Sequence, residues 1–343
     1  MTDIESKLRL GQVVREDGEH IVEGVLNCAA GNCQREFPIV DGIPLIVADL
    51  RRYITDNILA ITARRDLSEL MESILGDCCG PDAASEVVRQ QVGSYAWDHY
   101  ADLDTAEVRS EVRPGSMLRV LAVGLERMGQ LPPGPILDAG CSVGRGAFAL
   151  ASRTDDLVLG IDLNFPMLRL AAEVLRTGTV RYPRRRMGVV YDRREFPVNF
   201  DCADQVDFWA CDASAMPFMD HQFSAASCLN LLDCLAEPAR FLHELGRVLR
   251  TGSRAILACP YDWSTSATAL EAWLGGHSQR SPMSGSSEAI LRMLLSPGAH
   301  PNSSKRLHIV AEEDQLDWHV RLHERSTMNY KVHLVVVEAK DDG

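Results

Sequence analysis

The chain has 343 residues, a formal net charge of −13 and 46% hydrophobic residues, which is enough apolar material for one large domain or two. The acidic charge disfavours nonspecific attraction to nucleic acid or to an anionic membrane surface. No apolar run approaches the roughly 20 residues that a membrane-spanning helix needs, and the first residues lack the apolar core of a signal peptide. Ten cysteines without a regular framework indicate reduced thiols, so the sequence predicts a cytoplasmic protein.

Residues 1–50 form the first predicted segment, with short β elements between residues 20 and 47. The run Phe37-Pro-Ile-Val-Asp-Gly-Ile-Pro44 resembles the closing part of the small zinc-ribbon proteins that are activator partners of tRNA and release-factor methyltransferases. A full ribbon supplies four thiolates to a tetrahedral Zn²⁺. Only Cys28 and Cys33 are present here, in a C-x4-C spacing. We therefore expect a degenerate, metal-free segment that packs on the main domain.

Residues 51–130 show helical periodicity. Ile54, Ile58 and Ile61 recur at steps of three and four residues, and a further helix is expected to begin near Pro81. The run Ser94-Tyr-Ala-Trp-Asp-His-Tyr100 within this region is unusually aromatic. We expect a helical lid or linker over these residues.

From residue 131 onwards strands alternate with helices, which predicts an α/β domain over residues 131–343 with a parallel sheet and right-handed crossovers. Parallel strands are expected near residues 135–140, 157–162, 206–211, 223–230 and 254–260. The last two strands, near 307–325 and 330–338, are joined by a short turn and are expected to form an antiparallel hairpin.

The most informative motif is Ile136-Leu-Asp-Ala-Gly-Cys-Ser-Val-Gly-Arg-Gly146, an apolar strand that opens into a glycine-rich turn. Glycines let ligand atoms approach the bare backbone. Asp162 closes the next strand, where a carboxylate can accept hydrogen bonds from both hydroxyls of a ribose. Dinucleotide-binding proteins share this layout, but their third glycine has a different spacing. Asp138 is unhelpful beside a pyrophosphate and suits a cation, which points to a ligand with an ammonium and a sulfonium, such as S-adenosylmethionine.

This motif resembles the first motif, roughly D-x-G-x-G-x-G, of the class I S-adenosylmethionine-dependent methyltransferases of the small-molecule, type 11 kind. The resemblance covers about residues 95–338 and implies a Rossmann-like sheet with S-adenosylmethionine as cofactor. Ser142 replaces the usual middle glycine, so its backbone must keep a negative φ or accept strain. The cofactor-binding residues that the resemblance implies here are Asp138, Ala139, Gly140, Cys141, Ser142, Gly144, Asp162 and Leu163.

The run Trp209-Ala-Cys-Asp-Ala-Ser-Ala-Met-Pro-Phe218 resembles the family's adenine-binding segment, which implies that Asp212 and Ala213 contact the adenine. The combination of Asp138, Asp162 and Asp212 at three successive strand ends is a more specific indication of S-adenosylmethionine binding than any one of these residues alone. Asn230, at the end of the fourth strand, is expected to contact the cofactor near the transferred methyl group. The alternative for Asn230 is a polar strand end that is satisfied by neighbouring backbone.

Methyl transfer is an in-line displacement, so the protein mainly aligns the reactants, and a base is needed only if the nucleophile arrives protonated. The candidate catalytic residues are Asn230, Tyr261 and Asp262, although Asp262 is equally suited to cap a helix. Aromatic rings such as Trp263 can form a face for a cationic or planar substrate. The candidate substrate-binding residues are Tyr95, Trp263, Arg321, Tyr330 and His333.

An insertion at about residues 177–206 carries a basic patch that begins with Arg181-Tyr-Pro-Arg-Arg-Arg186. Interleaved arginine and tyrosine can hold nucleic acid through phosphate contacts and stacking. The same arginines can bind a carboxylate or phosphate of a small substrate. A solvated surface loop is the third interpretation.

Together these patterns predict a cytosolic methyltransferase that uses S-adenosylmethionine, binds no metal and acts on a small polar metabolite. Methylation of tRNA, rRNA or protein is the alternative within the enzyme class, with nucleic acid the less favoured partner. A non-catalytic regulatory module that retains the cofactor pocket is the alternative from another class. The sequence does not specify the oligomeric state.

Overall fold

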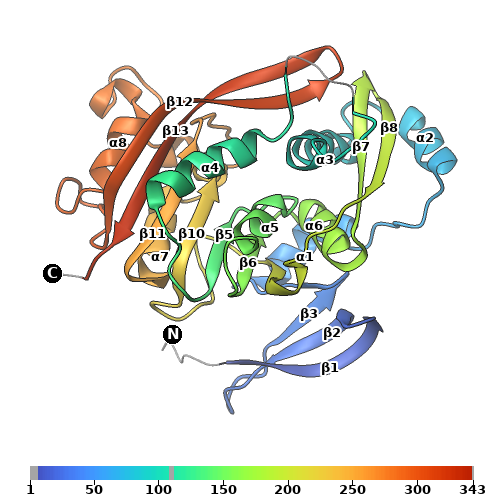
Figure 1. Cartoon of the computed structure of the whole chain (residues 1–343), viewed down its shortest axis with the longest axis horizontal. Helices are drawn as coiled ribbons and strands as arrows, with labels where there is room; N and C mark the ends of the chain where they lie inside the picture. Colours follow the sequence, from blue (N-terminus) through green and yellow to red (C-terminus); the bar gives the residue numbers. More distant parts are fainter. Residues whose placement is uncertain (1–6, 108–111, 342–343) are drawn as a thin grey trace.

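A seven-stranded sheet forms the centre of the computed structural model, which describes residues 7–107 and 112–341 (Figure 1). Its strands are β5 (Ile136–Ala139), β6 (Val158–Asp162), β9 (Val206–Ala210), β10 (Phe223–Leu229), β11 (Leu249–Cys259), β12 (Leu307–His323) and β13 (Ser326–Ala339). Their order is β12-β13-β11-β10-β5-β6-β9. The first five in chain order run parallel, and β13 lies antiparallel between β11 and β12. This arrangement confirms the predicted Rossmann-like α/β fold with its C-terminal hairpin.

Helices cover both faces of this sheet, which is why strands such as β10 are apolar along nearly their whole length. One face packs against α4 (Ser116–Met128), α5 (Arg145–Ala151) and α6 (Phe165–Thr177). The other face packs against α7 (Pro238–Val248) and α8 (Ser287–Leu294). Each helix buries one apolar stripe, so the sheet separates two apolar cores. Short 3-10 helices cover Ala203–Gln205, Leu232–Cys234, Leu270–Ala272 and Pro282–Gly285.

The N-terminal segment folds as a separate four-stranded antiparallel sheet, which lies below the main sheet in Figure 1. Its strands are β1 (Leu8–Asp17), β2 (His20–Cys28), β3 (Glu36–Val40) and β4 (Ile43–Pro44). The chain then runs along the edge strand β9, where Leu45 bridges Ala210 and the Ile46 N–H donates to the Ala210 carbonyl at 2.9 Å.

The zinc-ribbon-like interpretation of this segment is not supported. Among residues 7–107 and 112–341, no group of three or more histidine, cysteine or acidic side chains could hold a metal ion. Strand β1 was not expected, because its side chains are largely exposed and give no clear apolar alternation.

Three helices precede the central domain: α1 (Leu50–Ile61), α2 (Glu69–Cys78) and α3 (Ala84–Tyr100). The insertion forms an antiparallel hairpin of β7 (Thr179–Met187) and β8 (Val190–Pro197), which packs against α2 and α3 (Figure 1). The Glu324 N–H donates to the Arg186 carbonyl at 3.1 Å, so the tip of the C-terminal hairpin is tied to the insertion. No helix in the described part of the chain is long and apolar enough to cross a bilayer.

Candidate functional site

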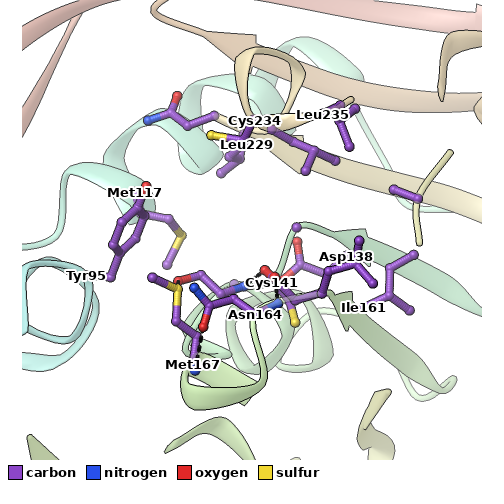
Figure 2. Close-up of a pocket in the computed structure, with 18 of the residues that line it drawn as sticks. Tyr95, Met117, Asp138, Cys141, Ile161, Asn164, Met167, Leu229, Cys234 and Leu235 are labelled. Carbon is purple, nitrogen blue, oxygen red and sulfur yellow. Dashed lines mark hydrogen bonds between the residues drawn. The ribbon is translucent and has the colours of Figure 1, made fainter. Parts of the chain in front are cut away.

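A cavity of about 490 Å³ opens at the carboxyl ends of β5, β6 and β10 (Figure 2). Open α/β sheets bind their ligands at this edge, because the loops that follow neighbouring strands meet there. Helix α3 contributes Tyr95 to the wall, and α4 contributes Met117. The volume lies in the range of ordinary cofactor pockets.

Asp138 lies at the end of β5 and faces this cavity (Figure 2). Its side chain is buried, and Oδ2 has no hydrogen-bond partner among the described residues. A Cβ at Gly146 would come within 2.7 Å of the same oxygen. Burial raises the pKa of Asp138 to about 7. A buried carboxylate oxygen without a partner costs free energy, so this position suits a cationic donor from a ligand.

Asp162 ends β6, and the neighbouring turns fix its orientation. Oδ2 accepts the Ser142 N–H and Oδ1 accepts the Asn164 N–H, each at 2.8 Å. Each oxygen keeps a second lone pair, which can accept a hydroxyl of a ribose. Burial raises the pKa of this carboxyl as well. Leu163 follows and lines the cavity, and its carbonyl accepts the Tyr53 hydroxyl of α1 at 3.0 Å.

The glycine-rich turn contains a strained serine. Ser142 has a φ of 52°, in the left-handed region that side chains with a Cβ rarely adopt. The sequence left open either a negative φ or a strained backbone at Ser142, and the structure has the strained backbone. Gly144 is required for packing, since a Cβ there would lie 2.6 Å from the Phe208 ring. Of the residues predicted in this turn, Gly140, Cys141 and Ser142 line the cavity, whereas Ala139 and Gly144 support it from behind.

We expect Ser142→Gly to raise the free energy of unfolding by roughly 0.5–1 kcal/mol. The left-handed conformation costs a side chain about 1–2 kcal/mol, and the greater entropy of unfolded glycine offsets part of that gain. Chemical denaturation measures the change. Ser142→Ala is the matched control, because it removes the Oγ contact to Met167 Sδ at 3.2 Å but keeps the strain. Equal stability of the glycine and alanine variants would contradict the strain argument.

At the third strand, Asp212 makes a contact that the sequence did not predict. Its Oδ1 accepts the Ser214 N–H at 2.8 Å, so it stabilises the local turn, and it does not line the cavity. Cys211 and Ala213 on either side of it do line the cavity.

Helix α3 supplies a wall that the sequence predicted only in part. Tyr95 points into the cavity (Figure 2). Gln91 and His99 lie one turn away on the same face, and neither was predicted. Burial lowers the pKa of His99 to about 3, so its imidazole is neutral, and its Nδ1 has no partner among the described residues. The spacing of four residues from Gln91 to Tyr95 and from Tyr95 to His99 could have predicted this shared face, because residues four apart lie on one side of a helix.

A second cavity of about 90 Å³ adjoins the first. The two cavities share four lining residues: Tyr95, Asn230, Cys234 and Trp318. Asn230 has a φ of 50°, its N–H donates to the Ala258 carbonyl at 2.7 Å, and its buried Oδ1 has no partner among the described residues. Asp262 and Tyr330 also line the second cavity, and the Tyr330 hydroxyl donates to Asp262 Oδ2 at 2.6 Å. The pair joins the end of β11 to the C-terminal hairpin.

Four other predicted residues line neither cavity. Tyr261 and Trp263 pack into the core beside α7 and α8. The Tyr261 hydroxyl bonds to His333 Nδ1 at 2.6 Å, and His333 Nε2 lies 2.7 Å from Glu312. Arg321 instead donates to the Arg185 carbonyl at 2.9 Å. Residues 261–263 follow the end of β11, and Tyr261 has a φ of 58°, so no strand alternation fixed their directions in advance. Asp262 lines the second cavity, whereas Tyr261 and Trp263 pack against the core.

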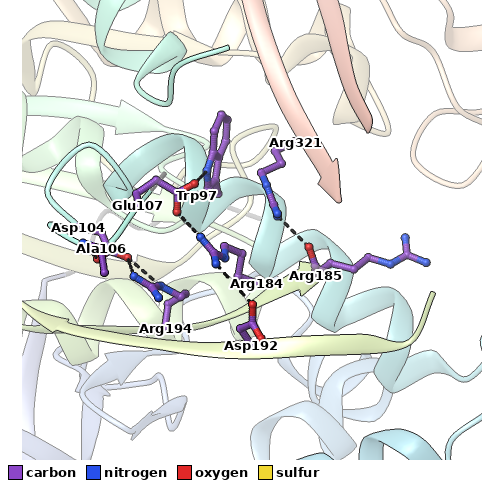
Figure 3. Close-up of polar contacts among 9 residues, drawn as sticks. All are labelled: Trp97, Asp104, Ala106, Glu107, Arg184, Arg185, Asp192, Arg194 and Arg321. Carbon is purple, nitrogen blue, oxygen red and sulfur yellow. Dashed lines mark hydrogen bonds and ion pairs between the residues drawn. The ribbon is translucent and has the colours of Figure 1, made fainter. Parts of the chain in front are cut away.

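The arginines of the insertion are engaged within the protein (Figure 3). Arg184 donates to Glu107 at 2.6 Å and pairs with Asp192 at 3.4 Å. Arg194 pairs with the buried Asp104, which also accepts the Ala106 N–H. The pairs with Glu107 and Asp104 fasten β7 and β8 to the loop after α3, and the pair with Asp192 joins the two strands to each other. The basic patch of the sequence is therefore largely an internal network, and neither cavity contains any of it.

The central part of the chain is similar to known proteins. Residues 137–257 match the family described as methyltransferase domain. The O-methyltransferase rstn1 of Aspergillus nomiae is 27% identical over 47% of this chain and 59% of its own length. The O-methyltransferase cnsE of Penicillium expansum is 27% identical over 52% of this chain and 55% of its own. The chain thus spans less than two thirds of these curated relatives.

Among solved structures, phosphoethanolamine N-methyltransferase 2 of Haemonchus contortus in complex with S-adenosyl-L-methionine is 20% identical. It covers 52% of this chain and 34% of its own, with a TM-score of 0.36. A S-adenosylmethionine-dependent methyltransferase from Methanosarcina mazei is also 20% identical, over 63% of this chain and 96% of its own, with a TM-score of 0.42. The matched segment contains the glycine-rich turn, Asp138, Asp162 and Asn230. Over these residues the chain is similar to a methyltransferase domain.

Proposed function

We propose that the whole chain is a S-adenosylmethionine-dependent methyltransferase that acts on a small polar metabolite by in-line methyl transfer. The observation that carries this proposal is the pair of adjoining cavities, one of cofactor size and one small, with Asn230 and Tyr95 in the shared wall. A cofactor and an acceptor bound side by side in this way would meet at that wall.

The residues of the large cavity fit the cofactor. Asp138, with its orphaned buried oxygen, would bind the ammonium of the methionine moiety. Asp162 would accept the ribose hydroxyls, and Leu163 and Ala213 would flank the adenine. Glycine is needed at both positions of the turn, because a Cβ at Gly140 would lie 2.9 Å from Leu231 and one at Gly146 would lie 2.7 Å from Asp138. When bound, S-adenosylmethionine supplies a methyl group on a positively charged sulfur.

The residues in the shared wall would align the reaction. Asn230 and Tyr95 restrict where an acceptor atom can approach, and alignment of this kind can supply about 7–11 kcal/mol of a barrier. Asp262, held by the Tyr330 hydroxyl, would orient the acceptor or take its proton. Tyr261, Trp263, His333 and Arg321 have no place in this proposed site.

Methylation of RNA or protein is supported only by the resemblance of the N-terminal segment to activator proteins. The internally paired arginines and the small second cavity favour a metabolite. A cytoplasmic location remains our expectation, and it rests on the ten cysteines that follow no regular framework in the sequence.

Calorimetry with S-adenosylmethionine and its demethylated product tests cofactor binding, and release of that product in the presence of metabolite pools tests turnover. Binding with turnover supports the proposal. Binding without turnover on metabolites, RNA or protein would identify a regulatory module, and absence of binding would overturn both interpretations.

Cofactor affinity is expected to fall about tenfold per pH unit as the pH drops below about 7. Burial raises the pKa of Asp138 to about 7, and the ammonium binds only the ionised carboxylate, so protonation competes with binding. The α-amino group of the cofactor itself loses its proton near pH 8, which places the highest affinity between about pH 7 and 8. Calorimetry at pH 6, 7 and 8, in two buffers of different ionisation enthalpy, measures both the affinity and the proton release. Constant affinity from pH 6 to 7.5 would contradict the assignment of Asp138.

A further inference from the structure

The second cavity has an unusual charge composition. Its walls include three carboxylates: Asp98, Asp233 and Asp262. Among the described residues that line either cavity, none is a lysine or an arginine. The one histidine, His99, is neutral, because burial lowers its pKa to about 3.

Neutral donors hold these carboxylates in place. Asp98 accepts the Ser116 and Met117 N–H groups at 2.7 and 3.0 Å. Asp233 Oδ2 accepts the Asp262 N–H at 2.8 Å, and Asp262 accepts the Tyr330 hydroxyl. None of the three forms an ion pair within the described part of the chain. Burial raises the pKa of Asp98 to about 6, and the positive charge of the nearby Arg119 opposes that rise only in part. Carboxylates around a cavity with low-dielectric walls concentrate cations there.

The remaining walls also suit a cation. Tyr95, Trp318 and Tyr330 present aromatic rings to the cavity, and aromatic faces attract ammonium groups. The buried Oδ1 of Asn230 lacks a partner and can accept an N–H of a ligand. This unsatisfied acceptor is independent of the carboxylates and points to the same kind of ligand.

We propose that the second cavity is a cation subsite that binds an alkylammonium group of the methyl acceptor. This inference rests on the proposed function, because it assigns the acceptor to the cavity beside the cofactor site. A volume of about 90 Å³ corresponds to about three water molecules, which is room for an ammonium head group rather than a polymer. An acceptor whose carboxylate or phosphate entered this cavity would be repelled.

Cys234 provides a direct probe, because it lines both cavities. Two methanethiosulfonate reagents, one with a trimethylammonium and one with a sulfonate group, are reacted with the full-length protein. Modification of Cys234 is followed by peptide mass spectrometry, and each rate is divided by the rate with a free small thiol. Burial raises the pKa of Cys234 to about 12, so both reagents are compared at one alkaline pH.

We expect the normalised rate of the cationic reagent to exceed that of the anionic reagent by about tenfold or more. Asp262→Asn removes one charge with little change in shape and should reduce this ratio several-fold. Asp155→Asn is the matched control, since Asp155 is exposed on the connection between α5 and β6, and should leave the ratio unchanged.

A wild-type ratio near one would overturn the cation subsite, even if a variant failed to fold. A high ratio that Asp262→Asn and Asp155→Asn alter equally would also overturn it, because the field would then come from the whole protein. The measurement needs no cofactor, so its result is separate from the binding and turnover tests of the proposed function.

Discussion

Asp138→Asn is expected to weaken binding of S-adenosylmethionine by about 10- to 100-fold at pH 7.5. Asparagine preserves the shape of the side chain but removes the negative charge, and a hydrogen bond to a charged group contributes about 1.5–3 kcal/mol. Because the orphaned oxygen is buried at the end of β5, water cannot replace the lost interaction. Calorimetry at this pH measures the loss.

The control for this variant is a ligand rather than a residue. Methylthioadenosine lacks the amino-acid part of the cofactor, so its affinity should stay within about twofold of the wild-type value. The pH dependence of cofactor binding below pH 7 should also disappear in the variant. A parallel loss of methylthioadenosine affinity would mean that Asp138 supports the whole pocket instead of binding the ammonium.

Arg194→Met is expected to lower the free energy of unfolding by about 3–5 kcal/mol, the usual cost of removing one partner from a buried ion pair. The variant leaves Asp104 without its cation, and that carboxylate is only 8% exposed. The hairpin of β7 and β8 would also lose one of its attachments to the loop after α3. Chemical denaturation gives the magnitude, and hydrogen exchange over residues 179–197 locates it.

Arg186→Met is the matched control on the same hairpin. The side chain of Arg186 is 55% exposed and lies 3.8 Å from Asp192, so its loss should cost less than about 1 kcal/mol. If the arginines bound RNA, Arg186 would matter for function and Arg194 less for stability. Similar small stability losses in the two variants would contradict the structural role of the patch.

The sequence predicted the features that depend on chain periodicity and on fixed strand ends. Alternating apolar segments gave the sheet, and the positions of Asp138 and Asp162 followed because the carboxyl ends of parallel strands share one edge. Asn230 lies directly after the fourth parallel strand, β10, as expected. These positions are set locally by strands and their first turn.

The features that the sequence missed depend on side-chain direction and on distant partners. The hydrogen bond from the Ser214 N–H to Asp212 was not predicted. Tyr261 was expected beside the acceptor, yet its hydroxyl bonds to His333 on the other side of the sheet. The arginines of the insertion pair with acids some 80 residues earlier in the chain. No local sequence pattern indicates that Glu107 and Asp104 lie next to these arginines in the fold.

The bridge between Leu45 and Ala210 gives the N-terminal segment a role that requires no metal. β9 is the outermost parallel strand, and an uncovered outer strand offers unpaired N–H and carbonyl groups to any other extended chain. Residues 45–46 occupy part of that row with backbone of the same molecule. The N-terminal segment thus covers part of the outer edge of the main sheet.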